Sequence, residues 1–166
     1  MEYWDIYDKD KNRTGRTMKR NDWTMKDGDY HLTVLGVVSR PDGRILITRR
    51  TMNKSWAAGC WEVPGGGVMA GEESREAVSR EVMEETGLDV SGCGDGYLFT
   101  YRRDNPGEGD NYFVDVYRFV LDFEETDVHL QESEADGFML ADADQIRDLA
   151  EQKQFLHYNS IFSAFA

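Results

Sequence analysis

The sequence predicts an α/β fold in which helices cover both faces of a mixed β-sheet. Segments rich in β-branched residues alternate along the chain with two segments of helical pattern, and such interleaving is typical of this architecture. A run of glycines separates one strand-like segment from the first helical segment. The 166 residues contain no repeat and no linker long enough to divide them, so we expect residues 1–166 to form a single domain.

The N-terminal residues are polar and rich in turn formers, which predicts an arm or hairpin over residues 1–30. Residues 8–19 superficially resemble a calcium-binding loop. However, Arg13 stands at the position where such a loop needs glycine, and Lys19 stands where it needs glutamate. We therefore interpret this stretch as a charged turn.

Two strands are expected next, joined by a turn at "RPDG". The first, "HLTVLGVVS", is rich in β-branched residues. In the second, Ile45 and Ile47 alternate with Leu46 and Thr48, which indicates that both faces of the strand are covered. A short strand at "CWEVPGGGV" then ends in a glycine loop.

A helix is expected over "EESREAVSREVMEETG", directly after the glycine loop. Glu72 and Glu73 suit the positive N-terminal end of a helix dipole, and Gly87 is a natural C-terminal stop. Further on, "GYLFTYR" and "NYFVDVYRFVLDF" have the pattern of strands separated by a polar loop. Residues 142–166 are expected to form a C-terminal helix followed by an aromatic tail.

The charge balance argues against several classes of partner. Asp and Glu number 32 against 19 Lys and Arg, which gives a formal net charge of −13. A sequence-independent grip on nucleic acid needs a basic surface, so we expect no nucleic-acid polymer as a partner. Anionic lipid would also be repelled. A polyanionic small molecule would need divalent cations between itself and the protein.

The cysteines and the apolar runs bear on the compartment. Cys60 and Cys93 form neither a CxxC pair nor a zinc-ligand spacing, which favours free thiols in a reducing compartment. The first residues lack the basic start and the apolar stretch of a signal peptide. The longest apolar-rich run, "LTVLGVV", is too short to span a bilayer. We therefore expect a cytoplasmic protein with no membrane partner.

Three glutamates crowd one face of the predicted helix. Glu81, Glu84 and Glu85 stand at i, i+3 and i+4, where like charges weaken a helix by about 0.2–0.5 kcal/mol per pair. A bound cation would offset that repulsion, and the glycine run could bring a backbone carbonyl close to the carboxylates. Oxygen ligands suit Mg²⁺ or Mn²⁺, which also bridge to substrate phosphates. The other interpretation is a solvated acidic face, which is common in a chain this acidic.

The spacing around these glutamates is more specific than the glutamates alone. From Gly66 to Leu88 the chain follows the pattern glycine-x5-Glu-x7-Arg-Glu-apolar-x-Glu-Glu-x-Gly-apolar. This pattern resembles the box of the Nudix family at every fixed position. The resemblance implies the Nudix fold, an α/β/α sandwich around a mixed β-sheet, in which residues 65–88 form the loop and helix of the box.

The resemblance also implies roles for individual residues. The implied metal ligands are the carbonyl of Gly65 and the carboxylates of Glu81, Glu84 and Glu85. Glu72 and Arg80 are implied to form a structural pair that braces loop and helix, and Val82 and Leu88 to be core contacts. The implied activity is a hydrolysis with Mg²⁺ (or Mn²⁺) as cofactor. In it, water attacks a phosphorus and breaks a pyrophosphate bond of a nucleoside diphosphate linked to another moiety.

Residues outside the box give weaker signals for a substrate site. Arg49 and Arg50 end a strand that leads toward the box, and alternation points only one of them inward. An inward guanidinium could hold a small-molecule diphosphate substrate. Trp56 and Trp61 flank the glycine loop and either could stack on a base, although Trp61 also fits a core position. The three histidines have no metal-ligand spacing, so we expect them to be structural or exposed.

The box does not settle the general base. In some Nudix enzymes this carboxylate lies on a loop a few residues before an aromatic position that opens the next strand, and "LQESEADGFML" is the matching stretch here. Glu132, well before Phe138, is our first candidate. Glu134 and the box residue Glu81 are the alternatives.

Two alternative functions stay open at the level of sequence. The stretches "EYWDIYDKDKNRTG" and "DYHLTVLGVVSRPDGRILITRR" are similar to isopentenyl diphosphate isomerases and their Nudix-like relatives. Cys60, however, lies upstream of the place where the isomerase cysteine would fall. A non-catalytic domain that senses a nucleotide would be favoured by loss of box glutamates, and none is missing. In addition, the N-terminal arm and the aromatic tail could build a homodimer contact.

Overall fold

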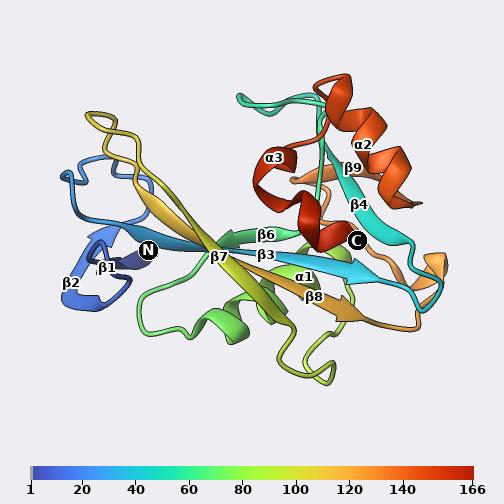
Figure 1. Cartoon of the computed structure of the whole chain (residues 1–166), viewed down its shortest axis with the longest axis horizontal. Helices are drawn as coiled ribbons and strands as arrows, with labels where there is room; N and C mark the ends of the chain where they lie inside the picture. The colour runs from blue at the N-terminus through green and yellow to red at the C-terminus, as the bar shows by residue number, and fades with distance from the viewer. Residues whose placement is uncertain (1) are drawn as a thin grey trace.

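The computed structural model describes residues 2–166, so Met1 of the predicted arm lies outside the described residues. Figure 1 shows the arrangement of the elements. The strands are β1 (Tyr3–Tyr7), β2 (Arg13–Lys19), β3 (His31–Ser39), β4 (Ile45–Arg50), β5 (Trp61–Glu62), β6 (Gly65–Gly67), β7 (Tyr97–Arg103), β8 (Tyr112–Val120) and β9 (Ala135–Ala141). The helices are α1 (Ser74–Thr86), α2 (Ala143–Glu151) and α3 (Tyr158–Ile161), with 3₁₀ turns at Glu125–Asp127 and Phe162–Phe165. Within residues 2–166, no helix combines the length and the apolar character that a membrane crossing needs.

Strands β3 to β9 form one mixed sheet. Its main path runs β5-β4-β3-β8-β7, with β6 paired to β3 and β9 paired to β4. β3 and β8 run parallel, from His31 opposite Tyr112 to Ser39 opposite Val120. The other pairings in this sheet are antiparallel. The mixed sheet predicted from the sequence is therefore confirmed.

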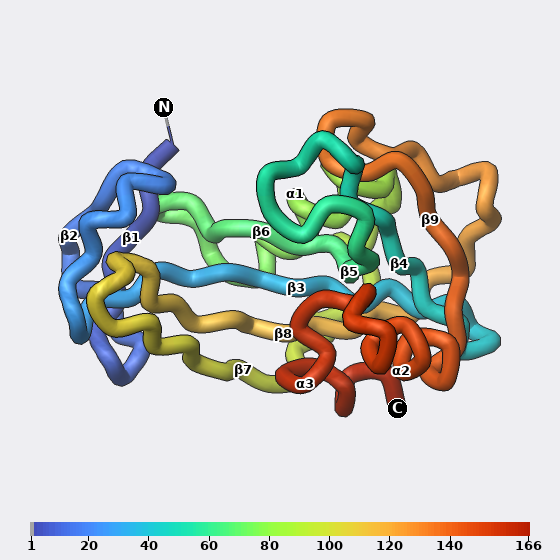
Figure 2. The backbone as a smooth tube through the Cα atoms, turned by 90° about the horizontal axis from the view of Figure 1, so that it is seen from above, coloured from blue at the N-terminus to red at the C-terminus, as the bar shows by residue number. Residues whose placement is uncertain are grey.

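Helices cover both faces of this sheet, as Figures 1 and 2 show. On one face, Leu32, Val34 and Val38 of β3 share a buried cluster with residues of α1. On the other face, Leu35 and Val37 share a cluster with residues of α2 and α3. Successive side chains of a strand point to opposite faces, so β3 supplies the centre of both cores. The predicted α/β/α sandwich is confirmed.

The glycine run is a strand, which corrects the expected glycine loop. Gly65–Gly67 form β6 and pair with β3, with Gly65 opposite Leu35. The close approach requires glycine, because a Cβ on Gly65 would lie 2.2 Å from the Val34 carbonyl oxygen. The backbone of the box is thereby held in the main sheet.

The hairpin of β1 and β2 forms a separate two-stranded sheet. It contacts the chain just before β3, where Tyr7 and Tyr30 exchange backbone hydrogen bonds of 2.7 and 2.9 Å. Trp4 and Ile6 of β1 pack with Met18 of β2 in a small core of their own. The hairpin lies beside the N-terminal end of β3 (Figure 2).

A buried carboxylate ties three segments to β8. Asp115 is only 2% exposed. It binds Lys11 Nζ at 2.9 Å, Ser74 Oγ at 2.6 Å and Thr100 Oγ1 at 2.5 Å. These donors come from the hairpin turn, the first residue of α1 and β7. The network therefore fixes the start of the box helix relative to the sheet.

Candidate active site

Local interactions define both ends of α1, the helix that carries the box glutamates. Glu73 is the N-cap, and the Glu73 amide donates to the Glu76 carboxylate at 3.2 Å in a capping box. Gly87 ends the helix in the left-handed conformation, with φ 76°, and its amide donates to the Met83 carbonyl at 2.9 Å. The sequence signals for the helix ends thus correspond to actual caps.

The packing of α1 on β3 sets the direction of its side chains. Val78 and Val82 are fully buried against the sheet. A Cβ on Gly36 of β3 would lie 2.9 Å from Val78 and 3.0 Å from Val82. Helix and strand therefore touch closely, and this contact fixes which face of α1 meets β6.

Two of the three box glutamates face β6. Glu81 is 9% exposed and lies against Gly66, where an added Cβ would be 2.5 Å from the Glu81 Oε1 atom. Glu85 accepts a hydrogen bond of 3.3 Å from the Gly65 amide. Glu84 is more open, with 47% of its side chain exposed. The structure thus brings Glu81 and Glu85 to the glycine strand and leaves Glu84 on the solvent side.

Arg80 connects the helix to the segment before it. Its Nε and Nη2 atoms donate to the two carboxylate oxygens of Glu72 at 2.8 and 3.0 Å. Nη2 also donates to the Gly67 carbonyl at 3.1 Å, and Nη1 donates to Glu81 at 2.9 Å and to Glu84 at 3.4 Å. The hydrogen bonds with Glu72 are the main reason that the pKa of Arg80 is raised. Burial opposes the effect on Glu72, but the bonds from Arg80 lower the pKa of that carboxyl.

Burial and mutual repulsion disfavour the charged forms of the other carboxylates. Burial raises the pKa of Glu85 well above its usual range, and the charges of Glu81 and Glu62 raise it further. Burial also raises the pKa of Glu81, although Arg80 opposes the rise. The pKa of Glu62 is raised by burial against the opposing charge of Arg50. A cation among these carboxylates would favour their ionised forms.

Arg50 faces this cluster and Arg49 does not. Arg50 donates to Glu62 at 3.1 Å and to the Trp56 carbonyl at 3.1 Å. The Arg49 side chain is 44% exposed and pairs with Asp136 at 2.8 Å. Alternation along β4 thus selects Arg50 as the inward arginine. Sequence reasoning missed Glu62, because a lone glutamate on a two-residue strand carries almost no signal.

The two loop glutamates differ in their relation to the cluster. Glu134 binds Lys54 at 2.7 Å, and after burial its charge is among the causes that raise the pKa of Glu62 and of Glu85. Glu132 is exposed, and no hydrogen bond or ion pair joins it to another residue in the described part of the chain. The structure therefore brings Glu134, rather than Glu132, near the carboxylates.

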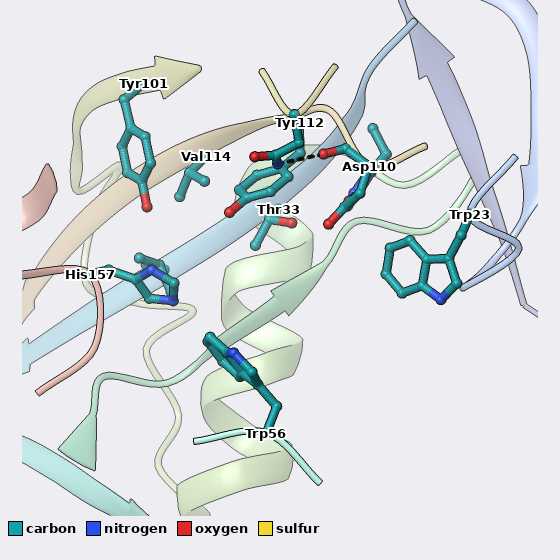
Figure 3. A pocket seen from close by; sticks show the side chains of 11 residues that line it. Trp23, Thr33, Trp56, Tyr101, Asp110, Tyr112, Val114 and His157 are labelled. Carbon is teal, nitrogen blue, oxygen red and sulfur yellow. Dashed lines mark hydrogen bonds and ion pairs between the residues drawn. The ribbon is translucent and has the colours of Figure 1, made fainter. Parts of the chain in front are cut away.

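A cavity of about 650 Å³ lies on the face of the sheet opposite α1 (Figure 3). Its lining residues are Trp23, His31, Thr33, Leu35, Trp56, Tyr101, Asn105, Asp110, Tyr112, Val114 and His157. A second cavity, of about 140 Å³, reaches Arg50, Glu62, Gly65 and Gly66. The two cavities share Thr33, Leu35, Trp56 and His157. One continuous hollow therefore leads from the glycine strand along β3.

Sequence reasoning also missed two aromatic residues of the large cavity. His157 packs near Trp56, with ring centroids 6.3 Å apart, and burial lowers its pKa. Trp23 comes from the segment between the hairpin and β3. Neither residue belongs to a motif, and only the fold brings them together. Tyr101 also lines the cavity, and burial raises its pKa to about 12.

The side chains alone do not form a closed metal site. Within residues 2–166, no group of three or more His, Cys, Asp or Glu side chains is arranged to hold a metal ion. Arg80 bridges Glu81 and Glu84 by donating to both. The donor chemistry nevertheless fits Mg²⁺ or Mn²⁺, because the cluster offers hard oxygens whose charges repel one another. The predicted metal ligands stay a prediction.

A family model described as NUDIX domain matches residues 29–161. The chain belongs to the Nudix family. The family predicted from the box is therefore confirmed. So is the hydrolase class that it implies, which acts on a pyrophosphate bond of nucleoside diphosphate derivatives.

Relatives extend the similarity over nearly the whole chain of this Nudix protein. It is 27% identical over 167 residues to an uncharacterized Nudix hydrolase of Listeria monocytogenes, covering 98% of this chain and 95% of the relative. It is 44% identical over 57 residues to an ADP-ribose pyrophosphatase of Methanocaldococcus jannaschii, covering 34% of this chain and 32% of the relative. The crystal structure of a MutT protein from Methanosarcina mazei matches with a TM-score of 0.65 at 25% identity, over 82% of this chain and 92% of that one.

Proposed function

We propose that this Nudix protein is a Mg²⁺-dependent (or Mn²⁺-dependent) hydrolase that cleaves the pyrophosphate bond of a nucleoside diphosphate linked to another moiety. One observation carries the proposal. The carboxylates of Glu62, Glu81 and Glu85 gather at the glycine strand beside the small cavity, and burial raises the pKa of all three. Without a cation these carboxyl groups favour their protonated forms, and a bound cation would favour the ionised forms. Perturbed groups of this kind gather at functional sites.

The chain's own residues divide into ligands and supports. The metal would be held by the Gly65 carbonyl, Glu81, Glu84 and Glu85, and when bound it would polarise phosphate oxygens and lower the pKa of a coordinated water. Glu72 and Arg80 support the ligands, because Arg80 holds Glu81 and Glu84 while it is itself held by Glu72.

Arg50 is the residue best placed to bind the substrate phosphates. Its guanidinium lies at the small cavity next to Gly65 and Gly66. Only 17% of the side chain is exposed, and Glu62 holds it in place. A guanidinium so oriented can donate a fork of two hydrogen bonds to a phosphate. Arg49, paired with Asp136 outside this cavity, is not proposed as a phosphate ligand.

Glu134 is the better supported general base. The attacking water must lose a proton, and a carboxylate beside the cluster can accept it. The charge of Glu134 acts on Glu62 and Glu85, whereas Glu132 is exposed. We therefore propose Glu134 ahead of the sequence candidate Glu132, with Glu81 as the alternative inside the box.

The experiment is a hydrolysis screen with and without Mg²⁺. Substrates should include nucleoside triphosphates, nucleotide sugars, ADP-ribose, dinucleoside polyphosphates and isopentenyl diphosphate. Glu84→Gln and Glu85→Gln should each lower turnover by orders of magnitude, while Glu151→Gln, an exposed helix residue far along the chain, serves as the control. Wild-type turnover in both box variants at Mg²⁺ near its KM would contradict the metal assignment.

The same assay separates the base candidates. Glu134→Gln should lower kcat by about 10²–10⁴-fold with little change in substrate KM, and the acidic limb of the pH–rate profile should flatten. Glu132→Gln should stay near wild type. A large loss of kcat in Glu132→Gln, with none in Glu134→Gln, would assign the general base to Glu132 instead. A cytoplasmic location and a homodimer contact stay predictions that this screen does not address.

A further inference from the structure

The large cavity has two aromatic walls at opposite ends. Trp56 stands near the box, and Trp23 stands near the N-terminal hairpin, as Figure 3 shows. Between them the floor is formed by side chains of β3 and β8, including Thr33 and Val114. A volume of about 650 Å³ is within the range that holds a nucleoside-sized ligand.

Both tryptophans are held by neighbours. The Arg50 guanidinium lies 5.2 Å from the centre of the Trp56 ring. Trp23 meets Trp4 edge to face at 6.3 Å. Its backbone passes close to Gly109, where a Cβ would lie 2.1 Å from the Trp23 carbonyl oxygen. Trp23 and Trp56 are 49% and 58% exposed, so each leaves ring surface open on which a planar ligand can stack.

The end of the cavity near the hairpin presents hydrogen-bond acceptors. Asp110 Oδ1 lies 2.9 Å from His31 Nε2, and His31 stacks on Trp4 at 3.9 Å. An ionised carboxylate can only accept, so the His31 Nε2 atom is the donor. Asn105 uses its Nδ2 atom to bind the Asp110 carbonyl at 2.7 Å. Within residues 2–166, no hydrogen bond occupies Asp110 Oδ2 or Asn105 Oδ1.

These features exclude two other kinds of ligand. No Lys or Arg lines the large cavity. An anionic group of a ligand would therefore find no Lys or Arg to pair with there and would be repelled by the Asp110 carboxylate. An apolar chain would leave the acceptors of Asp110 and Asn105 without partners, which is costly in a partly buried site. An uncharged planar group that carries N–H donors avoids this repulsion and supplies partners for the acceptors of Asp110 and Asn105.

We propose that this cavity binds the base of the substrate nucleotide, and that Asp110 and Asn105 select a base with two adjacent N–H donors, of the guanine type. The assignment rests on the proposed function, because it places the phosphates at the Gly65–Gly66 end of the same hollow. A carboxylate can accept from the ring N–H and the exocyclic amino group of guanine together, whereas adenine offers only its amino group on that edge.

The proposal also gives the N-terminal hairpin and the segment that follows it a part in specificity. Trp4 and Trp23 both precede residue 29, where the match to the family model begins. Trp4 positions His31, which positions Asp110, and Trp23 forms one wall. Trp4 and His31 are therefore positioning residues for the base.

Binding of nucleoside monophosphates tests the proposal without hydrolysis. The full chain in EDTA should be titrated with GMP, IMP, AMP and UMP, with tryptophan fluorescence and calorimetry as readouts. GMP should bind about 10-fold or more tighter than IMP, which lacks the 2-amino group, and than AMP. Asp110→Asn keeps an acceptor for His31 but should abolish this preference. Trp23→Leu should weaken all four ligands without changing their order.

The control is Asp104→Asn, an exposed acid of the same loop, which should bind like wild type. Equal affinities for the four nucleotides, no binding at all, or an unchanged preference in Asp110→Asn would each overturn the proposal. Preferential GMP binding by a protein that hydrolyses no diphosphate substrate would contradict the proposed function and leave only the guanine preference of the cavity standing. Hydrolysis of a diphosphate substrate by a protein that binds the four nucleotides equally would support the proposed function and contradict this inference.

Discussion

Replacing Gly66 with alanine is a direct test of the position of Glu81. The new Cβ would lie 2.5 Å from Glu81 Oε1 and 2.6 Å from its Cδ atom. Carbon–oxygen contacts this short do not persist, so the carboxylate must move by roughly 1 Å to reach ordinary van der Waals separation. The nearest atoms all belong to the end of one flexible side chain. The sheet itself therefore need not shift.

The expected effect is large on turnover and small on stability. A displacement of about 1 Å in a catalytic group lowers the rate by about 10²-fold. The displaced carboxylate also loses its 2.9 Å contact with Arg80. Arg80 keeps Glu72, so the free energy of unfolding should fall by only about 1 kcal/mol, or about 2–4 °C in Tm. The assay is kcat and KM on the best substrate of the screen, with thermal unfolding measured in parallel.

Two further variants make the reasoning refutable. Gly92→Ala adds a Cβ with no heavy atom within 4 Å, so it should match wild type in both measurements. In a Glu81→Ala background, Gly66→Ala should have no additional effect on turnover, because there is no carboxylate left to displace. Turnover of Gly66→Ala within threefold of wild type would show that the position of Glu81 does not matter. A further loss in the double variant would show that the alanine acts through another group.

Three other predictions concern charge and packing. Cys60→Ser should leave hydrolysis nearly intact, and incubation with isopentenyl diphosphate should give no dimethylallyl product; such a product, abolished by this substitution, would favour the isomerase alternative. Asp115→Ala should lower the free energy of unfolding in urea by about 1–3 kcal/mol, because it leaves the half-buried Lys11 and two hydroxyl groups without this acceptor; a loss under about 0.5 kcal/mol would contradict that account of the network. At pH 8 in EDTA, Glu85→Gln should raise Tm and Glu72→Gln should lower it.

Much of the fold follows from local patterns in the sequence. Ile45, Leu46, Ile47 and Thr48 are all buried, because a strand in the middle of a sandwich is covered on both faces. Gly87 ends α1 because it reaches the left-handed conformation without strain. The spacing of the box predicts which carboxylates face one another, since side chains three and four residues apart share a helix face. These relations depend on neighbours in sequence.

The remaining features depend on contacts between distant segments. β6 is a strand only because β3 lies beside it, and no pattern within three glycines indicates a strand. Glu62 joins the cluster through sheet pairing, and His157 reaches the cavity from the C-terminal tail. Glu134 and Glu132 stand two residues apart, and the contact with Lys54 distinguishes them. Local propensity contains none of this information.

The opposite signs expected for Glu85 and Glu72 follow from proton linkage. Burial raises the folded pKa of Glu85 above the unfolded value of about 4.3. Between these two pKa values the folded state keeps a proton that the unfolded state has lost, so stability falls as pH rises and stays lower above the folded pKa. For Glu72 the folded pKa is lowered, so its contribution is present above the unfolded pKa and is lost as pH falls through the folded pKa.

Comparison of the two variants across pH therefore distinguishes the destabilising charge of Glu85 from the stabilising charge of Glu72. The gain in the free energy of unfolding of Glu85→Gln, on the order of 0.5–2 kcal/mol at pH 8, should nearly vanish at pH 4, where the wild-type carboxyl is protonated in the folded state and mostly protonated in the unfolded state. The loss in Glu72→Gln should also shrink at low pH. Mg²⁺ should stabilise the wild type more than Glu85→Gln, because binding to the folded state alone raises stability. A gain in Glu85→Gln that is unchanged at pH 4 would show that packing, rather than charge, separates it from the wild type.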